Sequence, residues 1–146
     1  MSKFVQAFLS GIFFTFILDF FLFLGIKKNY TDFYEVGVYY NILFADNQNA
    51  LVFFLLAFFT GIFIMYVNNK ITVLVLGMMF LLSASTLIPK VGYKAGEFIL
   101  MQKNMAYRDA KHIYLGDAYF VGRETILFYD NELKKIILLD KKELKQ

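Results

Sequence analysis

Three long runs of apolar residues dominate the first ninety positions of the chain. The first covers 4–26 and contains one charged residue, Asp19, whereas the second (50–67) and the third (71–88) contain none. A helix needs about 20 apolar residues to cross a hydrocarbon core roughly 30 Å thick. The pattern therefore predicts three transmembrane helices. The first run is too long for the core of a signal peptide and lacks a small-residue cleavage site, so it is expected to be retained.

The second and third runs are joined by only three polar residues, Asn68, Asn69 and Lys70. Such a short connection predicts a tight antiparallel helix pair, since asparagine tolerates the backbone geometry of turns. Pro89 follows the third run directly. Because proline disfavours helical geometry in the residue before it, the third helix is expected to end there.

The segment 29–49 lies between the first two runs and is rich in aromatic residues. Within it, Phe33, Val36, Tyr40 and Leu43 recur at near-helical spacing. Two interpretations stay open. The segment forms a short amphipathic helix on the membrane surface, with its aromatic rings at headgroup depth, or an ordered loop packed on the spans.

After Pro89 the pattern changes to short β-branched and aromatic segments separated by turn residues. The segment 91–110 has no clear periodicity and is expected to be a connector, with a strand or a short helix around 98–101. Strand signals follow, and turns are expected at Gly116-Asp117 and Asp130-Asn131. The predicted strands cover 112–115, 118–121, 125–129 and 134–139. The fold class predicted is a membrane α-helical domain (1–90) plus a small water-facing β-rich domain (91–146), built of short antiparallel strands as an SH3-like barrel or a curled sheet.

Composition and charge agree with this division. The chain has 146 residues, of which 59% are hydrophobic, and 18 of its 27 charged residues lie in 91–146. The absence of cysteine excludes a disulfide scaffold and a zinc ribbon. No phosphate-binding loop or nucleophile motif occurs, and His112 has no metal-spaced partner, so no catalytic residue, cofactor or metal site is predicted. A charge of only +2 in 91–146 does not favour binding of nucleic acid.

The distribution of lysine predicts an orientation in the membrane. Cytoplasmic flanks of spans are enriched in Lys and Arg. One side carries four flanking lysines and the other two: Lys27, Lys28, Lys90 and Lys94 against Lys3 and Lys70. The count favours an outside N-terminus and a cytoplasmic C-terminal domain. The low Pro and high Phe and Lys content suggest a bacterial protein, and thus the bacterial inner membrane.

Small and polar residues on the predicted spans are candidates for helix contacts. Ala7, Gly11, Thr15 and Asp19 are four apart and form one stripe on the first helix. Asp19, with Thr15 beside it, is the candidate intramembrane polar contact. If it is charged and deep, its partner is expected to come from another chain, because the other two spans contain no Lys, Arg or His. If it hydrates at the interface, no partner is needed. Further packing positions are Ala57, Gly61, Gly77 and Ala84.

Two functional hypotheses follow. The first is a non-catalytic accessory or scaffold subunit of a larger bacterial membrane complex, with the β domain docking a protein partner. The alternative is a small homo-oligomeric channel or transporter component that uses Asp19. Beyond the lipid bilayer, the partners expected are therefore other proteins or further copies of the chain. Four lysines of the C-terminal domain are candidates for contact with a partner or with lipid headgroups: Lys134, Lys135, Lys141 and Lys142.

Overall fold

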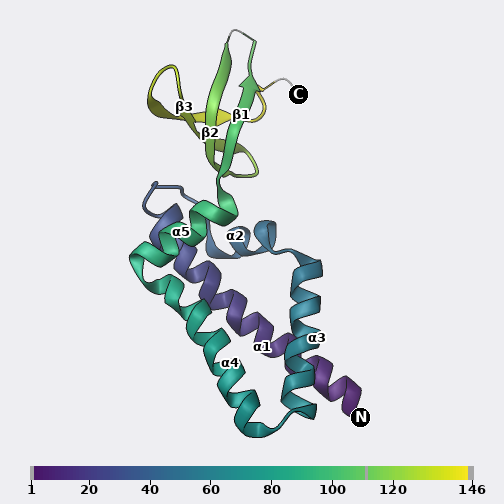
Figure 1. Cartoon of the computed structure of the whole chain (residues 1–146). Helices are drawn as coiled ribbons and strands as arrows, with labels where there is room; N and C mark the ends of the chain where they lie inside the picture. Colours follow the sequence, from purple (N-terminus) through teal and green to yellow (C-terminus); the bar gives the residue numbers. More distant parts are fainter. Residues whose placement is uncertain (1, 111, 145–146) are drawn as a thin grey trace.

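The protein consists of five α-helices and a four-stranded antiparallel sheet (Figure 1). The computed structural model describes residues 2–110 and 112–144. The helical elements are α1 (Lys3–Ile26) with a π-helical continuation η1 (Lys27–Thr31), α2 (Tyr40–Asn47), α3 (Ala50–Tyr66), α4 (Asn69–Ala84) with a 3-10 continuation η2 (Ser85–Leu87), and α5 (Pro89–Leu100). The strands are β1 (Gln102–Arg108), β2 (Ile113–Val121), β3 (Thr125–Asp130) and β4 (Lys135–Asp140).

Two or three of the helices are long and apolar enough to cross a membrane. Two helices have the required length and apolar composition by themselves, over Lys3–Thr31 and Asn69–Leu87. Helix α3 reaches the required length only when it is counted together with α2, and the two are bent by 88° relative to each other. The 17 residues of α3 would extend about 26 Å, slightly less than a typical hydrocarbon core. The three predicted apolar helices are thus present at the expected positions, while the polar corner Asn47–Asn49 separates α3 from α2.

The closest helix contact joins α1 to α3, where four small residues interlock. A Cβ atom on Gly11 would lie 1.8 Å from the carbonyl oxygen of Ala57, and one on Gly61 would lie 2.3 Å from that of Ala7. Both glycines and both alanines are buried. The two backbones therefore touch directly, which only small residues permit. The first half of the predicted stripe on α1 lies in this contact.

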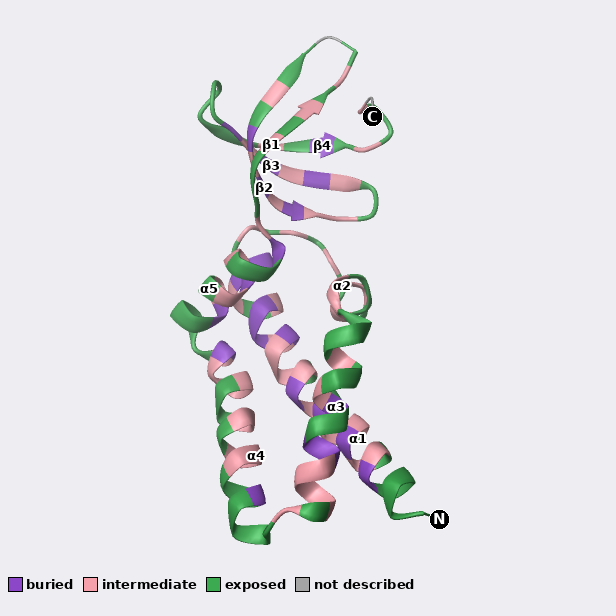
Figure 2. Ribbon diagram, turned by 45° about the vertical axis from the view of Figure 1, so that its right-hand side comes forward, coloured by how far each residue is buried: buried purple, intermediate pink, exposed green. Residues whose placement is uncertain are grey.

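Helices α3 and α4 do not form the tight pair that the short connection predicted. Both views show them diverging from their shared turn, with α1 crossing between them (Figures 1 and 2). At the turn, the Thr72 hydroxyl donates a hydrogen bond to the Phe63 carbonyl at 2.7 Å. Farther along, the backbone of α4 leaves α3, and Gly77 has no atom within 4 Å of the position a Cβ would take. Gly77 therefore makes no helix contact within the chain, and Ala84 is only half-buried.

The segment after Pro89, expected to be a connector, forms α5 and β1. Pro89 ends the third span as predicted and also occupies the first turn of α5, where a missing backbone N–H is tolerated. The buried face of α5 consists of Gly92, Gly96 and Leu100, spaced four apart. Gly92 allows the helix to approach the Thr86 carbonyl, which a Cβ would meet at 2.1 Å.

Helix α5 is more clearly amphipathic than the helix that forms within 29–49. In that segment, 29–31 complete η1 and Tyr40–Asn47 form α2, whose one buried residue is Leu43. Phe33 and Val36 lie outside α2, in a turn and an extended stretch. The segment is therefore closer to the ordered loop packed on the spans, since 32–39 is a loop and α2 is a short helix packed on α1.

The sheet is a meander in the order β1-β2-β3-β4, with every neighbouring pair antiparallel. The hairpin predicted around Asp130-Asn131 joins β3 to β4. The turn predicted at Gly116-Asp117 is absent. Instead β2 runs continuously through both residues, because Gly116 pairs with Met105 on one side and with Asp130 on the other. A side chain at Gly116 would meet the Tyr129 carbonyl at 1.9 Å, so the glycine reflects close packing and not a turn.

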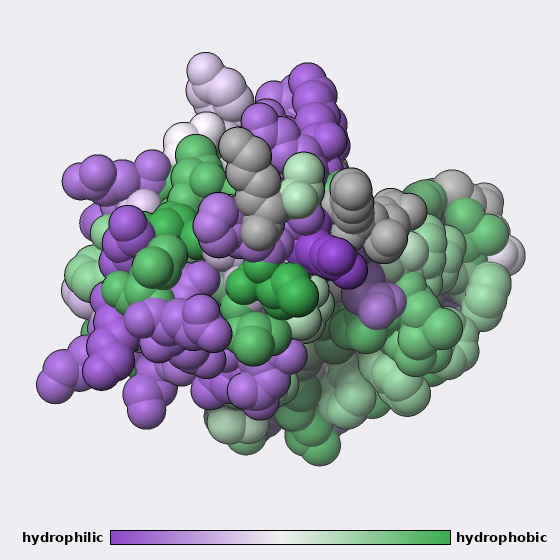
Figure 3. All heavy atoms as spheres, turned by 90° about the horizontal axis from the view of Figure 1, so that it is seen from above, coloured by the Kyte–Doolittle hydropathy of each residue, from purple (hydrophilic) through white to green (hydrophobic). Residues whose placement is uncertain are grey.

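Two separate apolar clusters stabilise the protein. One lies where α1, α2 and α5 meet the sheet and includes Phe23, Tyr30 and Phe120. The other fills the opposite face of the sheet around Ile126 and Phe128. Seen from above, polar side chains gather on one side of the molecule and apolar ones on the other (Figure 3). The sheet is therefore fastened to the helical part by a shared core.

The α1–α3 contact can be tested with two matched glycine variants. Gly11→Ala places a methyl group against the Ala57 carbonyl and should destabilise the protein by about 1–3 kcal/mol, as overpacking commonly does. Gly77→Ala adds the same group in open space, so it should be neutral or raise the melting temperature slightly, since alanine favours helix. Thermal unfolding in detergent measures both. Equal effects of the two substitutions would contradict the contact.

Candidate functional site

The candidate site is the outer face of the sheet, part of which the helices cover. A cross-strand row runs over three strands, since Phe120 pairs with Leu127 and Leu127 with Leu138. Residues directly opposite on antiparallel strands point to the same face. Along this row Phe120 is only 6% exposed, Leu127 is half-buried, and Leu138 is 66% exposed. The helical part thus covers the β2 end of the row and leaves the β4 end open.

The open part of this face extends beyond Leu138. Ile136 lies two residues away on the same face of β4 and is 46% exposed. It pairs with Tyr129, whose ring stacks on that of Tyr119 with 6.0 Å between centroids. We call Ile136 and Leu138, with the adjoining Tyr129, the β4 face. β4 is also the last strand of the sheet, so its outer edge pairs with no other described strand.

An ion pair holds the turn between β2 and β3 against α2. Arg123 donates to both carboxylate oxygens of Asp46, from Nε at 2.7 Å and from Nη2 at 2.6 Å. Its guanidinium lowers the pKa of the Asp46 carboxyl from the ordinary value of 3.8. Such two-point contacts fix orientation as well as distance. The pair is therefore one of the contacts that orient the sheet on the helices.

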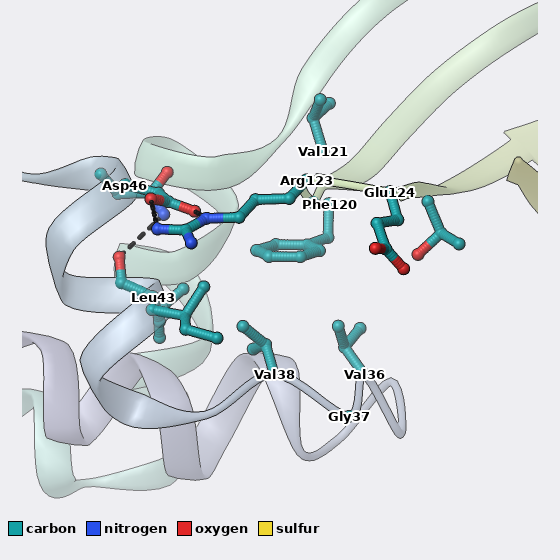
Figure 4. Close-up of a pocket in the computed structure, with 13 residues that line it drawn as sticks. Val36, Gly37, Val38, Leu43, Asp46, Phe120, Val121, Arg123 and Glu124 are labelled. Atoms are coloured by element: carbon teal, nitrogen blue, oxygen red, sulfur yellow. Dashed lines mark hydrogen bonds and ion pairs between the residues drawn. The ribbon is translucent and has the colours of Figure 1, made fainter. Parts of the chain in front are cut away.

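A cavity of about 320 Å³ lies beside this ion pair (Figure 4). The side chain of Phe120 extends into it toward Val36 and Val38. Apolar side chains form one wall, and Asp46 and Arg123, which neutralise each other, form another. The described lining also includes Glu124 and Thr125, from the turn that follows β2 and the start of β3.

A cluster of tyrosines forms the second connection between the sheet and the helices. The Tyr30 hydroxyl donates to the Tyr119 carbonyl on β2 at 2.9 Å. Tyr34 and Tyr93 share a hydrogen bond between their hydroxyls. Burial, followed by this hydrogen bond, raises the pKa of Tyr34. The Tyr34 hydroxyl therefore remains neutral, and the hydrogen bonds of the cluster help to position the sheet.

Asp19 has a hydrogen-bonding partner within its own chain. The Gln48 side-chain amide donates to its carboxylate at 2.7 Å, from the polar corner that precedes α3. A second cavity, of about 420 Å³, lies here and is lined mostly by apolar residues. This partner is an uncharged amide, so the hydrogen bond does not neutralise a charged Asp19. Thr15 is fully buried four residues away, where its hydroxyl lies 3.4 Å from that of Thr60 in the α1–α3 contact.

The four lysines of the C-terminal domain lie at the two ends of β4. Lys134 and Lys135 lie in and after the turn that opens β4, whereas Lys141 and Lys142 follow its end. Lys141 lies at the end of the sheet nearest the helices. Its backbone N–H donates to the Glu124 carbonyl at 2.9 Å, in the turn that also contains Arg123. Six residues of strand, about 20 Å, separate the pairs, so the four do not form one contact.

Within residues 2–110 and 112–144, no group of three or more histidines or acidic residues could hold a metal ion. His112 is exposed and lies at the β1–β2 turn, where its backbone N–H donates to Asp109. Comparison of the chain with protein-family models, with curated proteins and with solved structures finds no match.

The pH dependence of the sheet's position tests the Asp46–Arg123 pair. Because the pKa of Asp46 is lowered in the folded protein, the pair contributes its stabilisation above the ordinary pKa and loses it as pH falls through the lowered value. Spin labels on Asn69→Cys and Asn131→Cys report the distance between the helical turn and the sheet. We expect this distance distribution to broaden modestly between pH 7 and pH about 3.

Two variants distinguish this pair from other carboxylates. Asp46→Asn should show the broad distribution at both pH values. Asp32→Asn, which removes the Lys27–Asp32 ion pair, should retain the narrow distribution at pH 7. A narrow distribution in Asp46→Asn would show that the ion pair does not orient the sheet.

Proposed function

We propose that this chain is a non-catalytic, membrane-anchored docking subunit of a larger membrane complex, whose sheet binds a protein partner through the β4 face. The observation that supports the proposal most directly is the row Phe120–Leu127–Leu138, which is covered at one end and open at the other. A soluble surface does not ordinarily maintain adjacent large apolar side chains without a use for them. A partner seated beside the helices would complete the row.

The way in which the sheet is mounted supports a docking role. The Asp46–Arg123 pair, the Tyr30–Tyr119 hydrogen bond and the shared apolar cluster fix the sheet at one end of the helices. A sheet held in one orientation loses less entropy when it binds than one on a loose tether. The alternative, a channel that uses Asp19, is less well supported, because Gln48 already donates a hydrogen bond to that carboxylate.

A photoreactive amino acid at Ile136 tests the docking face in native membranes. We expect irradiation to give one discrete crosslinked product with another protein. Leu138→Asp should reduce its yield by about tenfold or more, because burial of a leucine contributes roughly 1.5–3 kcal/mol. The matched control is Leu133→Asp in the β3–β4 turn, where a leucine that is 54% exposed lies outside the face.

The proposal fails if Ile136 gives no crosslink, or only a crosslink to a second copy of this chain. Equal losses from the Leu138 and Leu133 variants would also contradict it. Thermal unfolding of both variants shows that their folds are intact. Because both side chains are exposed, we expect little change.

We also propose that the protein lies in the bacterial cytoplasmic membrane with its N-terminus outside and its sheet in the cytoplasm. The N-terminus and the sheet lie at opposite ends of the helical part (Figure 1). The sheet end carries four lysines near the ends of the spans, and the other end carries two: Lys27, Lys28, Lys90 and Lys94 against Lys3 and Lys70. This asymmetry supports the orientation.

Engineered cysteines test the orientation without background, because the chain contains no cysteine. Asn69→Cys and Asn131→Cys are exposed and lie on opposite sides of the predicted membrane. In intact cells we expect a membrane-impermeant maleimide to label position 69 and not position 131. Labelling of both after lysis is the control. The reverse pattern would overturn the orientation.

A further inference from the structure

A cavity of about 340 Å³ lies where the two long spans end, outside the docking face and outside the cavity of Figure 4. Its walls come from η1 and from the first turns of α5. The lining consists of Asn29, Phe33, Pro89, Lys90, Tyr93 and Lys94. Because η1 ends one apolar span and α5 directly follows another, the cavity lies at the expected boundary between hydrocarbon and water.

The cavity carries two positive charges that nothing nearby neutralises. Lys90 and Lys94 are one helical turn apart and both exposed. Among the described residues neither forms an ion pair, whereas the neighbouring acids Asp32 and Glu97 pair with Lys27 and Lys103. The two ammonium groups are therefore available to an anion.

The other wall is rigid and aromatic. The Phe33 and Tyr93 rings meet edge to face, with 5.4 Å between centroids. Asn29 donates from its side chain to the carbonyls of Thr86 and Leu87, at 2.8 and 3.3 Å, which ties η1 to the end of α4. The shape of the cavity therefore does not depend on a ligand, and only the lysine side chains need to be ordered by one.

The exposed ring of Phe98 favours a lipid over a soluble anion as the ligand of this cavity. Phe98 continues the line of Lys90 and Lys94 along α5 at the same spacing of four, and it is 89% exposed. Phe98 is not part of the cavity lining and lies one helical turn beyond Lys94. A phospholipid held by the two lysines is long enough to bring an acyl chain against this exposed ring. A soluble phosphate would leave Phe98 in water.

We infer that this cavity binds the phosphate headgroup of an anionic phospholipid, with Lys90 and Lys94 as the cationic ligands and Phe98 against the acyl chains. The site is thus on α5, and the inference does not depend on the four lysines around β4. It is also independent of the docking function, because the β4 face lies on another element.

Spin-labelled lipids measure this preference directly. The full chain is reconstituted in phosphatidylcholine bilayers, and the association of labelled phosphatidylglycerol is compared with that of labelled phosphatidylcholine. We expect the wild-type chain to prefer phosphatidylglycerol. Lys90→Gln with Lys94→Gln should reduce that preference on the order of fivefold for each lysine. The double variant Lys134→Gln with Lys135→Gln removes the same charge from the sheet and should retain it.

Two outcomes overturn the inference. Equal selectivity in the Lys90/Lys94 variant and the wild type would exclude the site. A saturable, lysine-dependent rise in melting temperature with millimolar inorganic phosphate in pure phosphatidylcholine would assign the cavity to a soluble phosphate instead. Circular dichroism of the variants shows that they are folded, which we expect because both side chains are exposed.

Discussion

The close approach of other backbones to α1 is the constraint on which the rest of the structure depends. Gly11 lets α3 touch α1 near one end, and Gly25 lets η2 touch it near the other, where a Cβ would lie 2.1 Å from the Thr86 hydroxyl oxygen. Apolar surface alone cannot hold helices together in lipid, because lipid is equally apolar. Contact distance and hydrogen bonds must do so instead, and α1 provides both.

The need for hydrogen bonds also explains where polar groups occur in the helical part. Where helices end or bend at membrane depth, exposed backbone groups need partners, since lipid offers none. The Thr86 hydroxyl donates to the Phe21 carbonyl at 3.0 Å, and Asn29 donates to the Thr86 carbonyl. Gln48 and Asp19 meet in the same way at the corner between α2 and α3. Thr86, Asn29 and Gln48 therefore lie where a helix begins, bends or ends, whereas Thr15 and Thr60 lie within the α1–α3 contact.

The three apolar helices, α1, α3 and α4, could be predicted from the sequence to within a few residues, because a long unbroken apolar run usually forms a helix that spans a membrane. The β3–β4 hairpin was equally accessible, since an Asp-Asn pair separates two clear strands. The structure of residues 91–110 could not be predicted, because Gly92, Ala95 and Gly96 obscure the amphipathic pattern of α5. At Gly116 the error was physical: glycine signals both a turn and a close backbone approach, and only the pairing partner Tyr129 decides between them.

The site was harder to foresee than the fold because it depends on contacts distant in sequence. Asp46 and Arg123 are 77 positions apart, and nothing local marks them as a pair. The sequence also does not show which face of β4 is exposed. The alternation in β4 places Ile137 and Leu139 in the sheet core, but Ile136 and Leu138 are equally apolar. Such a strand is expected to be covered on both faces, and the structure shows which face is not.

Exposed apolar residues on this protein therefore have different meanings at different depths. On α3 and α4, side chains such as Phe59 and Val73 are largely exposed, and a bilayer around the spans would cover them. Leu138 lies on the sheet beyond the ends of the helices, and Figure 2 shows that the sheet stands apart from the spans. The bilayer that accounts for Phe59 and Val73 does not account for Leu138. The proposed protein partner at the β4 face would account for it, and the contacts that join the sheet to the helices would determine where that partner sits.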